Sequence, residues 1–136
     1  MSIPTIILVA DDEPLVRDII EAVLEEGGYA VRLTSSGAEA LLALESTDEP
    51  LRALITDVNP GCGPSGWDVA RRARELNQTL PVIYMTGDSG YEWPSPGVPN
   101  SLLLIKPFAP SQLVTAISSL SIEAHADRAM EDPAPE

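Results

Sequence analysis

Reactive side chains stand at the ends of four short apolar segments of this sequence. They are Asp11, Asp12, Asp57, Thr86 and Lys106. Lys106 is the only lysine in the chain, and His125, in a polar C-terminal stretch, is the only histidine. A histidine base or a metal site with two imidazole ligands is therefore disfavoured. A reactive site in this chain has to be built from carboxylates, hydroxyls, backbone groups and Lys106.

If the carboxylates meet, their charge needs a counter-ion. Two carboxylates about 5 Å apart repel each other by roughly 3 kcal/mol at an effective dielectric constant near 20. A divalent cation removes that repulsion, and an all-oxygen set of ligands indicates Mg²⁺ or Mn²⁺ and not zinc. A carboxylate can also attack phosphorus and form an acyl phosphate without a general base, because an ordinary aspartate is ionised at neutral pH. Asp57 would then accept a phosphoryl group whose oxygens are stabilised by Mg²⁺, Lys106 and Thr86.

Composition limits the partners and the compartment. The chain has 136 residues, a length typical of one domain, and a formal net charge of −13. This charge disfavours binding to nucleic acid or to an anionic membrane surface, because both depend on Lys and Arg. The single cysteine, Cys62, cannot form an internal disulfide, and no segment resembles a signal peptide or a membrane span. We therefore expect a cytoplasmic protein.

The elements that must position the reactive residues are predicted from the apolar pattern. Short aliphatic and β-branched runs indicate strands that are buried on both faces. The predicted strands are residues 6–10, 29–34, 51–56, 81–86 and 102–105. Between and after them, apolar residues at helical spacing predict helices over residues 14–26, 36–44, 67–76 and 110–120.

Local signals predict how the helices begin and what they bury. An Asp N-cap with Pro14 starts the first helix, and Ser36 with Glu39 fits a capping box. The side chains expected to face the core are Leu15, Val16, Ile19, Ile20, Val23, Leu24, Ala40, Leu41, Leu44, Val69, Ala70, Ala73, Leu76, Leu113, Val114, Ile117 and Leu120. The three arginines of residues 67–76 are expected to be mostly solvated.

Strands that alternate with helices predict an α/β fold, a doubly wound five-stranded parallel sheet of the (βα)5 type. Ligands of such sheets bind beyond the carboxyl ends of the strands, at the topological switch point. All five reactive residues stand at such ends. Residues 87–100 contain Pro94, Pro96 and Pro99, so the fourth helix is expected to be irregular or shortened.

Four motifs in this order resemble the receiver domain of bacterial two-component response regulators. They are Leu8-Val9-Ala10-Asp11-Asp12-Glu13-Pro14, Ile55-Thr56-Asp57-Val58, Met85-Thr86-Gly87 and Ile105-Lys106-Pro107-Phe108. The resemblance covers about residues 5–120. It implies a flavodoxin-like sheet with strand order 2-1-3-4-5 and a cis Lys106–Pro107 bond. Residues 1–121 would form the receiver domain, and residues 122–136 an acidic, disordered tail.

The resemblance also implies roles for the reactive residues. Asp57 would be the phosphoacceptor, with Thr86 and Lys106 in contact with the phosphate. The Mg²⁺ ligands would be Asp57, Asp12, Asp11 through a water molecule, and Asn59 through its backbone carbonyl. The donor would be a histidine kinase or a histidine phosphotransfer protein. The domain would then signal to an unknown downstream protein, as a monomer or a phosphorylation-dependent dimer, or would serve as a phosphate shuttle or sink. Its only catalysis would be its own phosphorylation and dephosphorylation.

The sequence departs from the receiver pattern between residues 86 and 106. This segment is about two residues shorter than usual and rich in proline. Leu103 stands three positions before Lys106, where many receivers carry an aromatic switch residue. This departure favours signalling by loop rearrangement over signalling by an aromatic side-chain rotation.

Two other functions compete with the receiver interpretation. A magnesium phosphohydrolase with an aspartate nucleophile would carry a second Asp two positions later, where this chain has Asn59. A pseudo-receiver that acts only as an interaction surface would not need all five reactive residues. Of the two tryptophans, Trp67 is expected to pack in the core, whereas Trp93 suits packing and partner contact equally.

Overall fold

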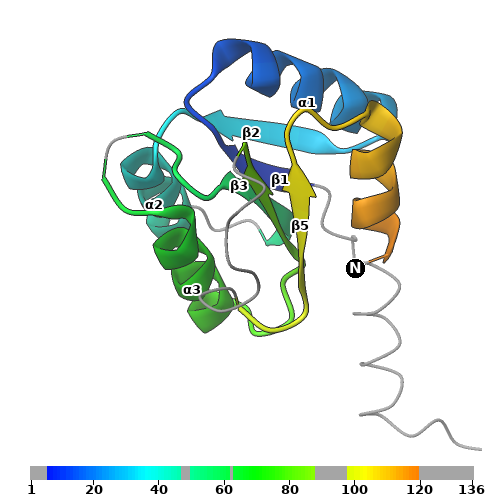
Figure 1. The fold of residues 1–136 in the computed structure, drawn as a ribbon. Helices are drawn as coiled ribbons and strands as arrows, with labels where there is room; N and C mark the ends of the chain where they lie inside the picture. The colour runs from blue at the N-terminus through cyan, green and yellow to red at the C-terminus, as the bar shows by residue number, and fades with distance from the viewer. Residues whose placement is uncertain (1–5, 47–49, 62, 88–97, 120–136) are drawn as a thin grey trace, which may run out of the picture.

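Parallel strands form the centre of the molecule. The computed structural model describes residues 6–46, 50–61, 63–87 and 98–119. Five strands in this part form one parallel sheet in the order β2-β1-β3-β4-β5 (Figure 1). They are β1 (Ile6–Ala10), β2 (Ala30–Thr34), β3 (Leu51–Asp57), β4 (Val82–Thr86) and β5 (Ser101–Ile105). The predicted fold class and strand order are confirmed, and each strand bound lies within one residue of its prediction.

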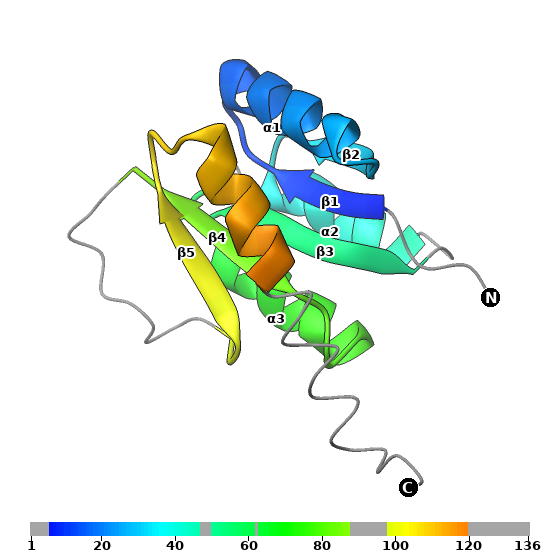
Figure 2. The ribbon, with the colours of Figure 1, turned by 90° about the vertical axis from the view of Figure 1, so that its right-hand side faces the viewer.

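Helices cover both faces of the sheet. α1 (Pro14–Glu26) and a helix over residues 110–119 lie on one face, and α2 (Gly37–Ser46) and α3 (Gly66–Leu76) on the other (Figures 1 and 2). Neighbouring strand residues point to opposite faces. Leu8 therefore packs with α2 and α3, and Val9 with α1 and residues 110–119. None of the helices in the described ranges is long and apolar enough to cross a membrane.

Several expectations fall on residues outside the described ranges. They concern Cys62, the irregular fourth helix with Pro94 and Pro96, Trp93, Leu120, His125 and the tail over residues 122–136. Trp67 is described. It is buried in the core with its ring centroid 4.5 Å from that of Tyr84, so its predicted packing role is confirmed.

The helices bury narrower stripes than the sequence predicts. Ile20 and Leu24 of α1 are fully buried, but Leu15 is 77% exposed and Ile19 50% exposed. These two side chains lie in the neighbouring row of the helix surface, about 100° around the helix axis from the buried row. They therefore reach solvent. The inward prediction was wrong for them and, for the same reason, for the half-exposed Val114. It was also wrong for Leu76, the last residue of α3, which is half-exposed at the end of that helix.

Two predicted helix starts also differ in detail. The N-cap of α1 is Glu13, and no side chain caps this helix. At α2, the Ser36 hydroxyl accepts a hydrogen bond from the Glu39 N–H as predicted. The Glu39 carboxylate, however, accepts from the N–H and hydroxyl of Ser35 and so bonds one residue earlier than the capping-box pattern requires.

Arg74 links α3 to the sheet at the ends where β4 and β5 begin. Its guanidinium donates hydrogen bonds to the carbonyl oxygens of Leu80 at 2.7 Å, Pro99 at 2.6 Å and Asn100 at 3.0 Å. These bonds tie the last turns of α3 to the segments that enter β4 and β5. The prediction that all three arginines of α3 are mostly solvated was therefore wrong for Arg74, whose burial lowers its pKa.

Candidate functional site

One ammonium group lies between carboxylates at the carboxyl edge of the sheet. Asp11 follows β1, Asp57 ends β3 and Lys106 follows β5, so three strands deliver these side chains to one place. The Lys106 Nζ donates to Asp11 Oδ2 at 2.7 Å, to Asp57 Oδ2 at 2.7 Å and to Glu13 Oε1 at 3.0 Å. The expected convergence at the switch point is therefore present in the structure.

The acidic side chains at this edge are close enough to share a cation. Asp11, Asp12, Glu13 and Asp57 each offer a carboxylate oxygen, and these oxygens lie within 4.8 Å of one another. Asp11 and Asp57 are buried, whereas Asp12 and Glu13 are exposed at the mouth of the site. An all-oxygen donor set of this kind, open on one side, fits Mg²⁺ or Mn²⁺.

Backbone contacts fix the two buried carboxylates. Asp57 Oδ1 accepts a hydrogen bond from the Asn59 N–H at 2.9 Å, and Asp11 Oδ1 accepts from the Glu13 N–H at 2.8 Å. Gly66 packs directly against the Asp57 backbone, because a Cβ atom at Gly66 would lie 2.1 Å from the Asp57 carbonyl oxygen. The Arg17 side chain also holds the Asp11 backbone, because its Nη1 donates a hydrogen bond to the Asp11 carbonyl oxygen at 2.7 Å.

The charges in the pocket are only partly balanced. Burial raises the pKa of Asp11, although the hydrogen bond from Lys106 opposes the shift. Burial alone would lower the pKa of Lys106, but hydrogen bonds to Asp11, Asp57 and Glu13 outweigh it and raise that pKa above its ordinary value. Lys106 therefore stays charged, while one ammonium shared among several carboxylates leaves the buried Asp11 with an incomplete counter-charge.

The remaining predicted residues lie beside this group. Thr86 ends β4 and is buried, and its carbonyl oxygen accepts a hydrogen bond from the Lys106 N–H at 2.7 Å. Asn59 is exposed and touches Asp57 through its backbone N–H. The Lys106–Pro107 peptide bond is cis, as the resemblance implied.

Two residues at the site were missed from the sequence. Glu13 belongs to the first of the four motifs, but the sequence predicted no role for it or for Arg17. The signal for Glu13 was its place directly after the Asp11-Asp12 pair. Arg17 lies one helical turn beyond Glu13, and that spacing allows its side chain to reach back to the loop that carries the aspartates.

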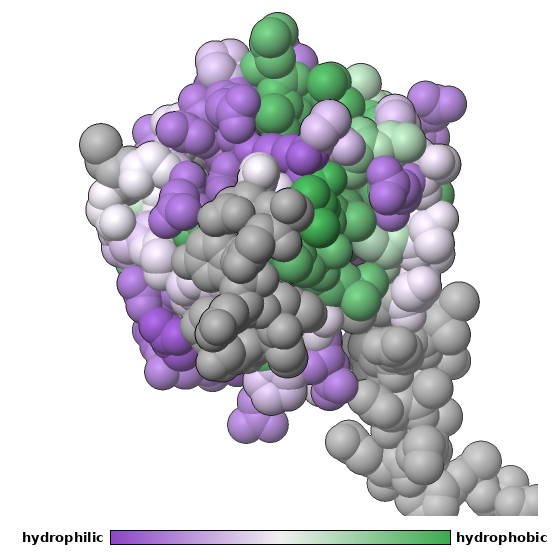
Figure 3. Space-filling view, viewed as in Figure 1, coloured by the Kyte–Doolittle hydropathy of each residue, from purple (hydrophilic) through white to green (hydrophobic). Residues whose placement is uncertain are grey.

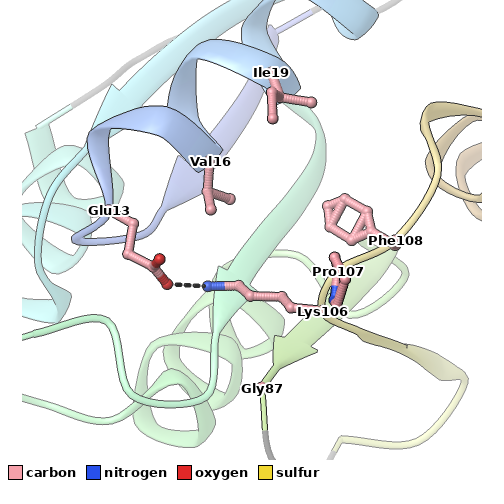
Figure 4. Close-up of a pocket in the computed structure, with 7 residues that line it drawn as sticks. All are labelled: Glu13, Val16, Ile19, Gly87, Lys106, Pro107 and Phe108. Atoms are coloured by element: carbon pink, nitrogen blue, oxygen red, sulfur yellow. Dashed lines mark hydrogen bonds and ion pairs between the residues drawn. The ribbon is translucent and has the colours of Figure 1, made fainter.

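A partly open hollow of about 390 Å³ adjoins the acidic group. Figure 4 shows Glu13 and Lys106 pointing toward each other at one side, with Val16, Ile19 and Phe108 around the other. Hydrophobic surface gathers over α1 and the region of β5 on this side of the molecule (Figure 3). The acidic site therefore opens beside an apolar surface.

Comparison with known proteins defines the class of this domain. The sequence matches the response regulator receiver domain family over residues 7–118. It is 34% identical over 121 residues to the response regulator receiver protein CpdR of Brucella abortus, covering 87% of this chain and 98% of that protein. It is 33% identical over 121 residues to the sensor protein EvgS of Escherichia coli, covering 88% of this chain but only 10% of EvgS.

A solved structure agrees with these matches. The response regulator receiver protein from Sinorhizobium medicae superposes with a TM-score of 0.83 at 40% identity, covering 89% of this chain and 97% of that one. The chain belongs to the response regulator receiver domain family. Domains of this family are signalling modules of two-component systems that work in phosphorelays with histidine kinases.

Proposed function

We propose that this chain accepts a phosphoryl group on Asp57 in a Mg²⁺-dependent reaction and thereby acts as the switch of a two-component phosphorelay. The single observation that carries the proposal is the Asp57 carboxylate held 2.7 Å from the only lysine ammonium, with three more carboxylates around it. A histidine kinase or a histidine phosphotransfer protein supplies the phosphoryl group. Output passes through protein contacts, or the domain acts as a phosphate shuttle or sink.

The residues divide the work according to their positions. Mg²⁺, held by Asp11, Asp12, Asp57 and the Asn59 backbone, would supply charge neutralisation for the incoming phosphoryl oxygens. Asp57 provides the nucleophilic oxygen at the end of a buried strand. Lys106 already contacts Asp57 and is placed to bind a phosphoryl oxygen once one is attached there.

Thr86 is proposed to hold another phosphoryl oxygen through its hydroxyl. Its support is its position, because it ends the strand next to that of Asp57 and its backbone bonds to Lys106. The hydrolase alternative has less support, because residue 59 is an exposed Asn whose described contact is a backbone hydrogen bond to Asp57. Position 59 therefore offers no carboxyl group for acid–base work.

The test is labelling by acetyl phosphate, followed by intact mass measurement. In Mg²⁺ the wild-type chain should gain one phosphoryl group that is stable in acid and labile in base, and it should gain none in EDTA. Asp57→Asn should gain none in either condition. The matched control is Asp18→Asn, which removes an exposed aspartate of α1 and should label as the wild type does. Labelling that persists in Asp57→Asn would remove Asp57 from the proposed mechanism.

A further inference from the structure

Glu13 makes the least constrained of the three ion pairs at Lys106. Its side chain is 59% exposed, against 0% for Asp11 and 12% for Asp57. Asp11 and Asp57 are each held by a backbone N–H as well, whereas Lys106 is the one described residue that bonds the Glu13 carboxylate. A phosphoryl oxygen that arrives at Lys106 must displace a carboxylate, and Glu13 is the one that is free to move.

The Glu13 side chain stands on the route by which a leaving group departs. In an in-line displacement the leaving group exits on the side opposite to the attacking oxygen. Asp57 lies buried at the bottom of the site, so that side is the open mouth, where Asp12 and Glu13 are exposed. The 390 Å³ hollow, lined by Glu13 and Lys106, provides the space (Figure 4).

We propose that Glu13 selects phosphoryl donors by the charge of their leaving group, favouring donors with a phosphorus–nitrogen bond over acyl phosphates. The inference rests on the proposed function of Asp57 and adds a residue that sets the preference among donors. A displaced Glu13 carboxylate at the mouth attracts a leaving group that carries positive charge and repels one that becomes an anion. Asp12 shares the mouth, but Mg²⁺ would neutralise it as a ligand, which leaves Glu13 as the uncompensated charge.

The two donor classes differ in the charge that departs. With phosphoramidate, the Asp57 oxygen bonds to phosphorus as the P–N bond breaks. The nitrogen is already protonated, so it takes the bonding electron pair and leaves as neutral ammonia, and its positive charge persists into the transition state. With acetyl phosphate the P–O bond breaks, and acetate leaves with the electron pair as an anion. Glu13 therefore stabilises the first transition state relative to the second.

The test compares the two donors on one variant. Initial labelling rates are measured with phosphoramidate and with acetyl phosphate at equal pH and ionic strength, in Mg²⁺ shown by calorimetric titration to be saturating for each variant. In Glu13→Gln the ratio of the phosphoramidate rate to the acetyl phosphate rate should fall by about three- to tenfold, the effect of one charge at the distance of a neighbouring side chain. The fall should shrink at high salt.

Two controls isolate the charge at this position. Glu13→Asp keeps the carboxylate, so its rate ratio should stay near that of the wild type. Glu25→Gln removes one charge from the exposed far end of α1, so it matches the change in net charge and should leave the ratio unaltered. Glu13 makes no side-chain cap on α1, so Glu13→Gln should not disturb the start of that helix.

The outcomes separate the two proposals. If the wild type is labelled at Asp57 by both donors and Glu13→Gln leaves the ratio unchanged, the inference about Glu13 is wrong and the proposed function stands. Equal loss of both rates in Glu13→Gln would indicate a structural role and would also overturn the inference. If neither donor labels the wild type, the proposed function itself has failed.

Discussion

Lys106 should stabilise the fold by neutralising buried carboxylates, and its replacement by methionine measures that contribution. The carboxylate oxygens of the site lie within 4.8 Å of one another, a distance at which two charges repel by roughly 3 kcal/mol at an effective dielectric constant near 20. Breaking a buried ion pair typically costs about 3–5 kcal/mol. Because the Lys106 side chain is 13% exposed and water can enter, we expect a loss near the lower end, about 3 kcal/mol.

The assay is urea unfolding in EDTA and in saturating Mg²⁺. In EDTA, Lys106→Met should unfold at a urea concentration lower than that of the wild type by between about 1 and 3 M, given usual denaturant slopes. Mg²⁺ should recover most of this loss, because a divalent cation replaces the missing ammonium among the carboxylates. Mg²⁺ should therefore stabilise Lys106→Met more than it stabilises the wild type.

Controls separate the pocket from general charge effects. Arg32→Met removes an exposed cation from β2 and should change the stability by less than about 0.5 kcal/mol. Adding Asp57→Asn to Lys106→Met should restore part of the lost stability, since one of the repelling carboxylates is gone. The reasoning is refuted if Lys106→Met is as stable as the wild type in EDTA, or if Mg²⁺ stabilises both proteins equally.

Three further predictions concern other parts of the site and its support. Gly66→Ala should lower stability by about 2 kcal/mol or more and slow the labelling of Asp57, because the new methyl group meets the Asp57 carbonyl oxygen; urea unfolding and labelling check these two effects. Gly87→Ala, whose new Cβ would meet no described residue within 4 Å, should leave the stability unchanged. Burial raises the pKa of Asp11, so the contribution of this carboxyl to stability is greatest below the ordinary aspartate pKa and is lost as the pH rises through the raised folded pKa. In EDTA, the stability of Asp11→Asn relative to the wild type should therefore increase as the pH rises above about 4, and a difference that does not change with pH would contradict this. Tyr84→Phe should lower the free energy of unfolding by about 1–3 kcal/mol in the same assay. The Tyr84 hydroxyl accepts a hydrogen bond from the buried Val98 N–H at 3.1 Å, and this N–H would lose its partner.

The parts of the fold that sequence reasoning predicted well are those that depend on burial alone. Strands buried on both faces must be apolar throughout, so the runs at residues 6–10 and 82–86 stand out at once. The alternation of these strands with helices indicates a parallel sheet, in which the carboxyl ends of all strands lie at the same edge. Asp11, Asp57 and Lys106 stand at such ends, so the sequence predicts that they lie near one another. The position of these three residues needed no knowledge of side-chain conformation.

The parts that the sequence did not reveal depend on how long polar side chains are directed. Arg74 looks like a solvated residue in any helical pattern, yet its planar group fits three carbonyl oxygens that the fold brings within reach. Glu13 looks like a residue of an exposed first helical turn, and its bond to Lys106 spans 93 positions of sequence. Such contacts follow from tertiary geometry, and the helical pattern of the sequence does not specify the partner of either side chain.

The same sequence separations make the site a property of the whole domain. The ion pairs of Lys106 join residues 95 and 49 positions apart, and the ammonium comes from the turn after the last strand of the sheet. A fragment that ends before β5 would hold the acidic side chains without their cation. The site with its ammonium in place therefore exists only in molecules whose sheet is complete. A partly folded chain cannot form part of the site and retain part of its function.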